Sequence, residues 1–595
     1  MHSRHPTLTL LIALVFVALT PGITAASPTT DAQLRTLFDT TWQKELEAEP
    51  QMANYLGDNR YNDRWTDMSG AAIERRHQHD LITLAALRAI PRASLSPAAQ
   101  LDYDLFEREY TQRLAIWPFK PHLYSINHQG GIQTLHEVTE LLQFRTTKDY
   151  EDWIARLEGV GTLIDQHITL LEQAVREGRT QPRVIMQRIP SQLALQNVAK
   201  PEQSPFCAPF TRFPEEFDAA TRARLTSAGR GAIERVVLPA YARFTKTFNE
   251  IYLPATRSTV GISDTPQGRD YYRERVTYHT TLSSLTADEI HDIGLAEVRR
   301  IRAEMMAVKE KVGFKGSLQE FFTFLRTDPQ FYYKSSQELF EGYLAVSKRI
   351  DPNLVRVFGK LPRTPYGVRP IPMTSAPNTT TAYYQGPAAD GTRPGFYYVN
   401  LYRPEVRPKY EMEVLSIHEA VPGHHLQIAL AMEQAAKPDF RRHAGYTAYV
   451  EGWALYSESL GEELGLYQDP YSKFGQLTYD MWRAVRLVVD TGIHAKGWTR
   501  EQAIAFFINN AAKTEADIVN EVDRYISWPG QALAYKIGQL RIQDLRREAE
   551  TTLGSHFNVR AFHDTVLETG AVPLDLMESH VRAWINKEKL LDSSR

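Results

Sequence analysis

A proline and a glycine interrupt what would otherwise be a metal-binding helix at residues 418–427, which read HEAVPGHHLQ. Two histidines one turn apart on a helix can hold a metal, and a glutamate beside the first can activate water. Here the position one turn after His418 is Pro422, whose ring clashes with the carbonyl group four residues earlier. Gly423 follows and permits unusual backbone geometry. The segment therefore predicts a helix that stops or bulges before the next histidines.

Two histidines are candidates for the second metal ligand, His424 and His425. In an undistorted helix either would lie about 9–10 Å along the axis from His418. That is too far for two nitrogens that each lie about 2.0–2.1 Å from one zinc ion. Helical periodicity favours His425, whereas a two-residue bulge favours His424, which directly follows Gly423. We predict His424 as the ligand and keep His425 as the alternate ligand or as a donor to a ligand.

Three glutamates complete the candidate site. Glu451, in the sequence YVEGW, is the predicted third ligand, because a catalytic zinc takes three protein ligands and keeps one position open. Glu419 is the predicted general base. Glu458 lies two turns after Glu451 on the same helix face and is predicted to orient a ligand imidazole. We expect one Zn²⁺ per chain, and the same ligand set also accepts other first-row metals.

Later tyrosines are candidates for work beside the metal. Peptide hydrolysis passes through an oxyanion that needs a hydrogen-bond donor. Tyr535 is the first candidate for this catalytic role, and packing in the core is the alternative. Tyr525 is the second candidate and is also predicted to contact the substrate.

A polar stripe runs along one predicted helix, because Arg486, Asp490 and His494 stand at i, i+4 and i+8. One interpretation is a ladder that supports the metal site through Asp490 and ends in a catalytic, substrate-facing His494. The other interpretation, which we favour for the stripe as a whole, is a solvated charged face.

The β-prone residues 396–400 are the predicted place for substrate backbone, because an extended peptide can pair with an edge strand. A structural hairpin packed on the metal helix is the alternative. The substrate-binding candidates in this region are Tyr383, Tyr384, Tyr398 and Asn400. Four cations are each candidates to bind a substrate C-terminal carboxylate, and the sequence does not choose among Lys536, Arg524, Arg393 and Arg369.

Most of the chain has the 3.6-residue periodicity of helices, as in residues 150–177, 473–490 and 531–550. Residues 286–289 and 499–502 are capping boxes, which mark helix starts. We predict a mainly α fold of two helical lobes around a deep cleft, with a small β element near the metal site.

Two further segments shape the expected organisation. Residues 1–26 have a basic start, an apolar run and small residues at the end, which predicts a secretory signal peptide. Residues 27–595 are then expected to form a single helical domain. Within it, the proline-rich residues 180–216 around Cys207 predict a surface excursion or a connection between lobes.

Composition narrows the class of protein. The chain has 595 residues, 43% of them hydrophobic, which is ample for a large core. A net charge of −3 without a long basic run argues against a nucleic-acid partner. Cys207 is the only cysteine, so no intramolecular disulfide is possible, and we expect its thiol to be inert. We expect a periplasmic or secreted protein with no stable membrane span after signal cleavage; the sequence leaves the oligomeric state open.

The chain also resembles a known family. Residues 418–427 match the pattern HExxxGHxxQ of a large bacterial family labelled a domain of unknown function, which is grouped with the gluzincin-like metallopeptidases. The resemblance extends from about residue 30 to the C-terminal region and includes GRDYY at 268–272, EIH at 289–291 and WPGQALAY at 528–535. The segment carrying Glu451 and Glu458 is also similar to the third-ligand helix of thimet oligopeptidase-type enzymes. The extra residues between His418 and His424 depart from the standard spacing.

Motif and resemblance together imply an exported zinc-dependent peptidase that hydrolyses short peptides by metal-activated water, with Glu419 as general base. One alternative is a catalytically silent peptide-binding protein, although a pure binder needs no glutamate beside His418. Another is a zinc hydrolase of a different amide or ester, because a metal site alone does not define the acyl group.

Overall fold

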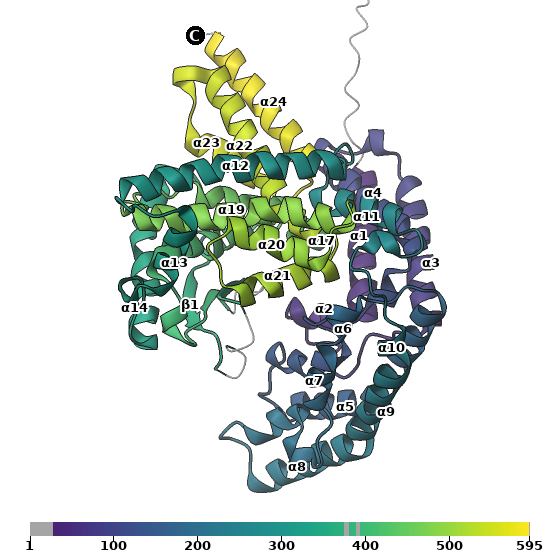
Figure 1. Cartoon of the computed structure of the whole chain (residues 1–595). Coiled ribbons are helices and arrows are strands. Elements are labelled where there is room, and N and C mark those ends of the chain that lie inside the picture. The colour runs from purple at the N-terminus through teal and green to yellow at the C-terminus, as the bar shows by residue number, and fades with distance from the viewer. Residues whose placement is uncertain (1–27, 374–375, 377–379, 388–392, 594–595) are drawn as a thin grey trace, which may run out of the picture.

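The computed structural model describes residues 28–373, 376, 380–387 and 393–593, and it is built mainly of helices (Figure 1). The predicted signal peptide lies outside the described residues. The helices of the first part are α1 (Pro28–Ala48), α2 (Pro50–Tyr55), α3 (Gly70–Arg88), α4 (Pro97–Ile116), α5 (Thr147–Arg176), α6 (Arg183–Met186), α7 (Ile189–Ala194), α8 (Ala219–Ala232), α9 (Leu238–Thr247) and α10 (Leu253–Ala255).

The second part holds the residues of the predicted metal site. Before the sheet come α11 (Gly268–Thr280), α12 (Ala287–Lys311), α13 (Leu318–Thr327) and α14 (Ser336–Ile350). After it come α15 (Met412–Glu419), α16 (His424–Met432), α17 (Asp439–Arg442), α18 (Thr447–Glu458), α19 (Pro470–His494), α20 (Arg500–Asn510), α21 (Glu515–Ser527), α22 (Ala534–Leu553), α23 (Val559–Glu568) and α24 (Leu574–Ser593).

The predicted helices and their starts are confirmed. Residues 150–177, 473–490 and 531–550 fall largely in α5, α19 and α22. Both predicted capping boxes form, because the side chains of Thr286 and Thr499 accept hydrogen bonds from the third residue of α12 and of α20. The mainly α fold with a small β element is therefore confirmed, whereas the deep cleft stays a prediction.

A three-stranded sheet precedes the helices that carry the predicted metal ligands. Its order is β1 (Tyr366–Pro370), β3 (Gly395–Val399) and β2 (Ala382–Gln385), with β3 parallel to β1 and antiparallel to β2. The strand predicted to lie at an edge is thus the central one, and its hydrogen-bonding groups pair on both sides. The prediction of an open edge at residues 396–400 is wrong, and β1 and β2 are the edges.

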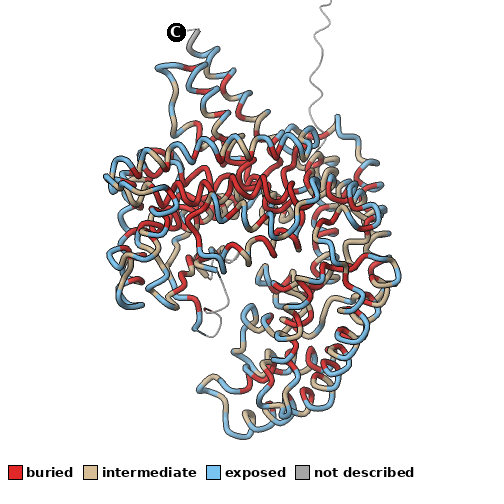
Figure 2. Tube along the Cα trace, in the orientation of Figure 1, coloured by how far each residue is buried: buried red, intermediate tan, exposed pale blue. Residues whose placement is uncertain are grey.

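A layer formed by α12 and α19 crosses the middle of the molecule, with α5, α8 and α9 toward one end and α22, α23 and α24 toward the other (Figure 1). Buried residues concentrate in this middle layer (Figure 2). From Phe474 to His494, all residues of α19 except Trp482 are buried. Because α19 is covered on nearly all sides, its polar side chains must find partners inside the protein.

Residues 180–216 differ from the predicted surface excursion. They form short helical segments, including α6 and α7, and most of their apolar side chains join a large hydrophobic core, although Leu195 is exposed. Cys207 lies in this core, where burial raises the pKa of its thiol. A buried thiol with a raised pKa is unreactive, which agrees with the inert cysteine expected from the sequence.

Helices α18 and α22 cross backbone against backbone. A Cβ atom at Gly452 would lie 2.5 Å from the Cα of Gly538, and one at Gly538 would lie 1.9 Å from the carbonyl oxygen of Ala448. Any side chain at these two positions would force the helices apart. This contact fixes α22 against the residue that follows Glu451.

Among the described residues, no helix is both long enough and apolar enough to cross a membrane.

Candidate metal centre

The predicted break in the metal helix is confirmed. Helix α15 ends at Glu419 and α16 begins at His424, and the backbone between them departs from helical geometry at Ala420 (φ −99°, ψ −109°) and Gly423 (φ −73°, ψ −125°). A Cβ atom at Gly423 would lie 2.0 Å from the carbonyl oxygen of His418. Glycine is therefore required for the chain to turn back so closely on α15.

Helix α18 holds this turn in place. The indole nitrogen of Trp453 donates a hydrogen bond of 2.8 Å to the carbonyl oxygen of Pro422. Trp453 is fully buried and stands two residues after Glu451. One helix thus both supports the turn and carries the predicted third ligand.

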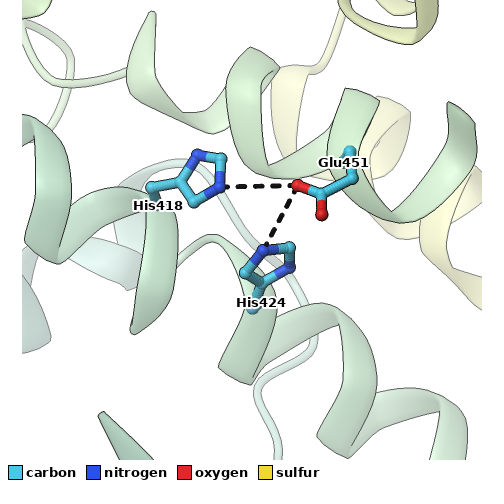
Figure 3. Close-up of side chains that lie close together, drawn as sticks. All are labelled: His418, His424 and Glu451. Atoms are coloured by element: carbon cyan, nitrogen blue, oxygen red, sulfur yellow. Dashed lines mark ion pairs between the residues drawn. The ribbon is translucent and has the colours of Figure 1, made fainter. Parts of the chain in front are cut away.

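Three side chains converge beside the turn (Figure 3). One ligand atom from each of His418, His424 and Glu451 lies within 4.8 Å of the other two. Oε2 of Glu451 is 3.6 Å from Nε2 of His418 and 3.5 Å from Nε2 of His424. The two imidazole rings are nearly perpendicular, with centroids 4.8 Å apart. The geometry therefore brings together the three residues predicted as ligands.

The chemistry of this cluster fits a metal ion. Oε2 of Glu451 is buried and has no hydrogen-bond partner among the described residues, which is costly for a carboxylate oxygen. Burial alone would lower the pKa of His418, but the carboxylates around it raise that pKa to about 9. The side chains of His424 and Glu451 remain 12% and 20% exposed, so the cluster is not sealed from solvent. Two imidazoles and one carboxylate suit zinc and leave a fourth position open.

Glu458 contacts His418, as the sequence predicts, and its role toward a metal stays a prediction. Its Oε1 lies 2.8 Å from Nδ1 of His418, and a carboxylate can only accept, so Nδ1 donates and Nε2 is left free for a metal. Arg483 of α19 lies 3.6 Å from the same oxygen and forms an ion pair with Glu458. The sequence analysis missed Arg483, although an arginine inside the apolar pattern of residues 473–490 is a signal for a buried ion pair.

Replacing Glu458 with glutamine is expected to weaken zinc affinity about 10- to 100-fold, because the charge that fixes the His418 imidazole is lost. Competition with a chelator would measure the affinity. Glu463→Gln is the matched control, since Glu463 pairs with Arg546 at the surface and should leave zinc affinity unchanged. Equal affinities in folded Glu458→Gln and wild-type protein would contradict the role of Glu458.

Glu419, the predicted general base, directly follows His418 in the chain. It is the last residue of α15, is half-buried, and makes no hydrogen bond or ion pair within the part of the chain that the structure describes. Its charge is among those that raise the pKa of His418. An unpaired carboxylate next to a metal ligand is available to accept a proton.

His425 is not available as the alternate ligand. Its Nε2 lies 3.1 Å from the carbonyl oxygen of Thr364, and its Nδ1 lies 2.8 Å from the hydroxyl of Tyr384. Since the carbonyl can only accept, Nε2 donates to it and Nδ1 accepts from the tyrosine. Burial lowers the pKa of His425 to about 4. This histidine ties α16 to β2 and to the segment before β1.

The sheet residues predicted to bind substrate differ in their exposure and in their distance from the predicted metal ligands. The ring of Tyr384 stacks near that of His424, with centroids 6.5 Å apart, although its hydroxyl is used by His425. Tyr383 is exposed and stacks on Tyr398. Asn400 is fully buried, and its amide donates to the carbonyl oxygens of residues 376 and 380. Asn400 therefore shapes the loop, and its predicted contact with substrate is wrong.

The polar stripe on α19 is neither exposed to solvent nor in contact with the predicted metal ligands. His494 is fully buried, its Nδ1 accepts from the backbone N–H of Ile262, and its Nε2 donates to the carbonyl oxygen of Tyr525. Asp490 accepts from the Tyr272 hydroxyl and from the backbone of the Trp-Pro-Gly turn, while burial raises its pKa to about 7. Both residues have structural roles. The predictions of a catalytic His494 and of an Asp490 that supports a metal ligand are therefore wrong.

The two late tyrosines separate in role. Tyr525 is fully buried, and its hydroxyl donates to Glu521 while accepting from Trp482 and Arg486. Its hydroxyl has no hydrogen-bonding capacity left for a substrate, so the predicted substrate contact of Tyr525 is wrong. Tyr535 stands in the first turn of α22, and its hydroxyl accepts from Arg524. Its role at an oxyanion stays a prediction.

Comparison with known proteins assigns the chain to a family. A search of curated proteins finds no match. The crystal structure of a "putative lipoprotein" from Colwellia psychrerythraea is similar with a TM-score of 0.87 and 29% identity, covering 94% of this chain and 99% of that one. A "putative lipoprotein of unknown function" from Shewanella oneidensis shares the fold, with a TM-score of 0.66, 19% identity, and coverage of 93% and 99%. The model of the family described as "Bacterial protein of unknown function (DUF885)" matches residues 50–581. With nearly its whole length matched, the chain belongs to this DUF885 family.

Proposed function

We propose that this protein is an exported, zinc-dependent peptidase that hydrolyses short peptides. The observation that carries the proposal is the convergence of two imidazole nitrogens, from His418 and His424, on a buried oxygen of Glu451 that has no hydrogen-bond partner among the described residues. The unpaired carboxylate of Glu419 adjoins this cluster. That combination is the arrangement that metal-assisted hydrolysis requires.

Each side chain has a defined task in this proposal. Zinc held by His418, His424 and Glu451 would polarise the scissile carbonyl and lower the pKa of water toward about 7. Glu419 accepts the proton of the attacking water and passes it to the leaving amine. Glu458 keeps the His418 imidazole in the tautomer that leaves Nε2 free.

Tyr535 is the candidate donor to the oxyanion. Its hydroxyl accepts hydrogen bonds from Arg524 and Gln531, and no acceptor for its own proton is found among the described side chains. A hydroxyl that is held by two donors and keeps a free proton can give that proton to a developing negative charge.

Export belongs to the same proposal. The two structural relatives carry the lipoprotein description quoted above, and residues 1–26 have the pattern of a secretory signal. We place the mature protein in the periplasm or outside the cell.

Metal content and cleavage measured on the same samples test the proposal. Plasma mass spectrometry of wild type and His418→Ala would be combined with digestion of a mixed peptide library. We expect about one zinc per wild-type chain, with zinc and cleavage lost together in the variant. Absence of both in wild type, with no rescue by added zinc, would refute the peptidase. Stoichiometric zinc with cleavage only of non-peptide esters or amides would reassign the acyl group.

A further inference from the structure

We propose that Arg486 and Arg524 bind the C-terminal carboxylate of the substrate, so that the preferred substrates are short peptides with a free C-terminus. The inference rests on the proposed peptidase function and deepens it by naming the substrate class.

The two arginines share a single carboxylate. Oε2 of Glu521 lies 3.1 Å from Nη2 of Arg486 and 3.5 Å from Nη1 of Arg524, and it also accepts the Tyr525 hydroxyl at 2.7 Å. Asp490, whose charge also reaches Arg524, is turned to other partners. Two cations against one engaged carboxylate leave a positive charge without a direct counter-ion. Inside a protein such an imbalance is costly, and a bound anion would relieve it.

Donor capacity also remains unused. Arg486 is 4% exposed, and its Nη1 is buried with no hydrogen-bond partner among the described residues. The Arg524 side chain keeps 14% of its surface exposed, so a ligand from solvent would reach Arg524 first. Arg524 also donates to the hydroxyl of Tyr535, and the ring of Tyr535 lies 4.4 Å from the Arg486 guanidinium carbon. Planar guanidinium groups with free N–H donors are the protein groups best suited to a carboxylate.

The pair is linked to the metal centre by two routes. Arg486 lies one turn after Arg483 on α19, and Arg483 reaches Glu458, which holds His418. Tyr535 stands one turn before Gly538 on α22, at the close crossing with the helix that carries Glu451. Both helices that present the cluster are therefore anchored against the metal ligands.

Two other cations suggested by the sequence have different surroundings. Lys536 is fully buried between Asp480 at 2.7 Å and Glu297 at 2.8 Å. Arg369 lies over the ring of Phe396, with its guanidinium carbon 3.5 Å from the ring centroid. The geometry thus favours the arginine pair over these two.

A pair of peptide libraries tests the inference on the zinc-loaded, full-length protein. A pooled tetrapeptide library would be made in two forms, one with the free C-terminal carboxylate and one with a C-terminal amide. We expect kcat/KM for the free acids to exceed that for the amides about 10- to 100-fold, as the loss of charge-assisted hydrogen bonds implies. Mass spectrometry would follow the depletion of each form.

Arg524→Met should bring the ratio of kcat/KM for the acids to that for the amides down to about one; the ratio is the readout, because Arg524 also holds the Tyr535 hydroxyl and its loss can slow both forms alike. Arg500→Met is the matched control, because Arg500 pairs with Asp523 on the same helix as Arg524 and should keep the preference. If Arg524→Met does not fold, the acid-to-amide ratio of the wild type still decides the question.

A failure of the carboxylate site can be distinguished from a failure of the proposed peptidase function. Equal cleavage of acids and amides by wild type would overturn carboxylate binding and leave the peptidase standing. If nothing is cleaved, retention of each library on immobilised Glu419→Gln protein gives the answer. Retention of acids alone, lost in the Glu419→Gln/Arg524→Met double variant, would support the carboxylate site without the peptidase. Equal retention, or none, would overturn the carboxylate site.

Discussion

Glu419→Gln protein is expected to bind zinc like the wild type and to hydrolyse peptides at least about 100-fold more slowly, since a positioned general base contributes about 10²–10⁴ in rate. Glutamine has the shape of glutamate but cannot accept the proton of water. Glu419 makes no hydrogen bond or ion pair within the described chain, so its replacement removes chemistry without breaking a structural contact. The measurements are kcat on a cleaved library peptide and zinc per chain.

Glu413→Gln controls for the loss of a carboxylate from the same helix. Glu413 pairs with Arg349 and accepts from the backbone N–H of Tyr467, away from the metal ligands. We expect its variant to keep activity within a few-fold of wild type. Full activity in the Glu419→Gln protein would remove Glu419 from the mechanism, whatever the control shows.

His424→Ala and His425→Ala are expected to differ sharply in zinc content. The structure directs His424 at Glu451 and engages both nitrogens of His425 with Tyr384 and the Thr364 carbonyl. Removal of His424 leaves two protein ligands, too few for a stable zinc site, so zinc and activity should both be lost. Removal of His425 breaks buried hydrogen bonds, which costs about 1–3 kcal/mol of folding stability, and zinc should stay.

Zinc per chain after dialysis, together with the thermal midpoint of each variant, separates metal loss from unfolding. His424→Ala should keep a cooperative transition but lose the rise in midpoint that added zinc gives the wild type. Zinc retained by His424→Ala and lost by His425→Ala would reverse the ligand assignment.

The cluster of His418, His424 and Glu451 could be predicted from the sequence because two of its members flank a single helix break. A proline one turn after His418, followed by Gly423, can be accommodated only by a break, and the break selects among nearby histidines. Helical periodicity alone, however, could not have selected His424 over His425 as the ligand. It depends on Thr364 and Tyr384, which lie far away in the chain and occupy the His425 ring.

The stripe on α19 was misjudged because sequence spacing places residues on a face without showing what covers that face. Asp490 and His494 are buried by α11, by the segment around Ile262 and by the Trp-Pro-Gly turn. The strand at residues 396–400 was misjudged for a similar reason. Its position in the sheet depends on β1 pairing in parallel with it across a long connection, and strand propensity carries no information on such pairing.

The contact between Gly452 and Gly538 also limits how this protein can move. With no side chains between them, α18 and α22 have no room to slide or tilt against each other. Glu451 and Tyr535 consequently travel as parts of one rigid body. Any opening at this site must therefore be hinged elsewhere, and the spacing between Glu451 and Tyr535 is set when the chain folds.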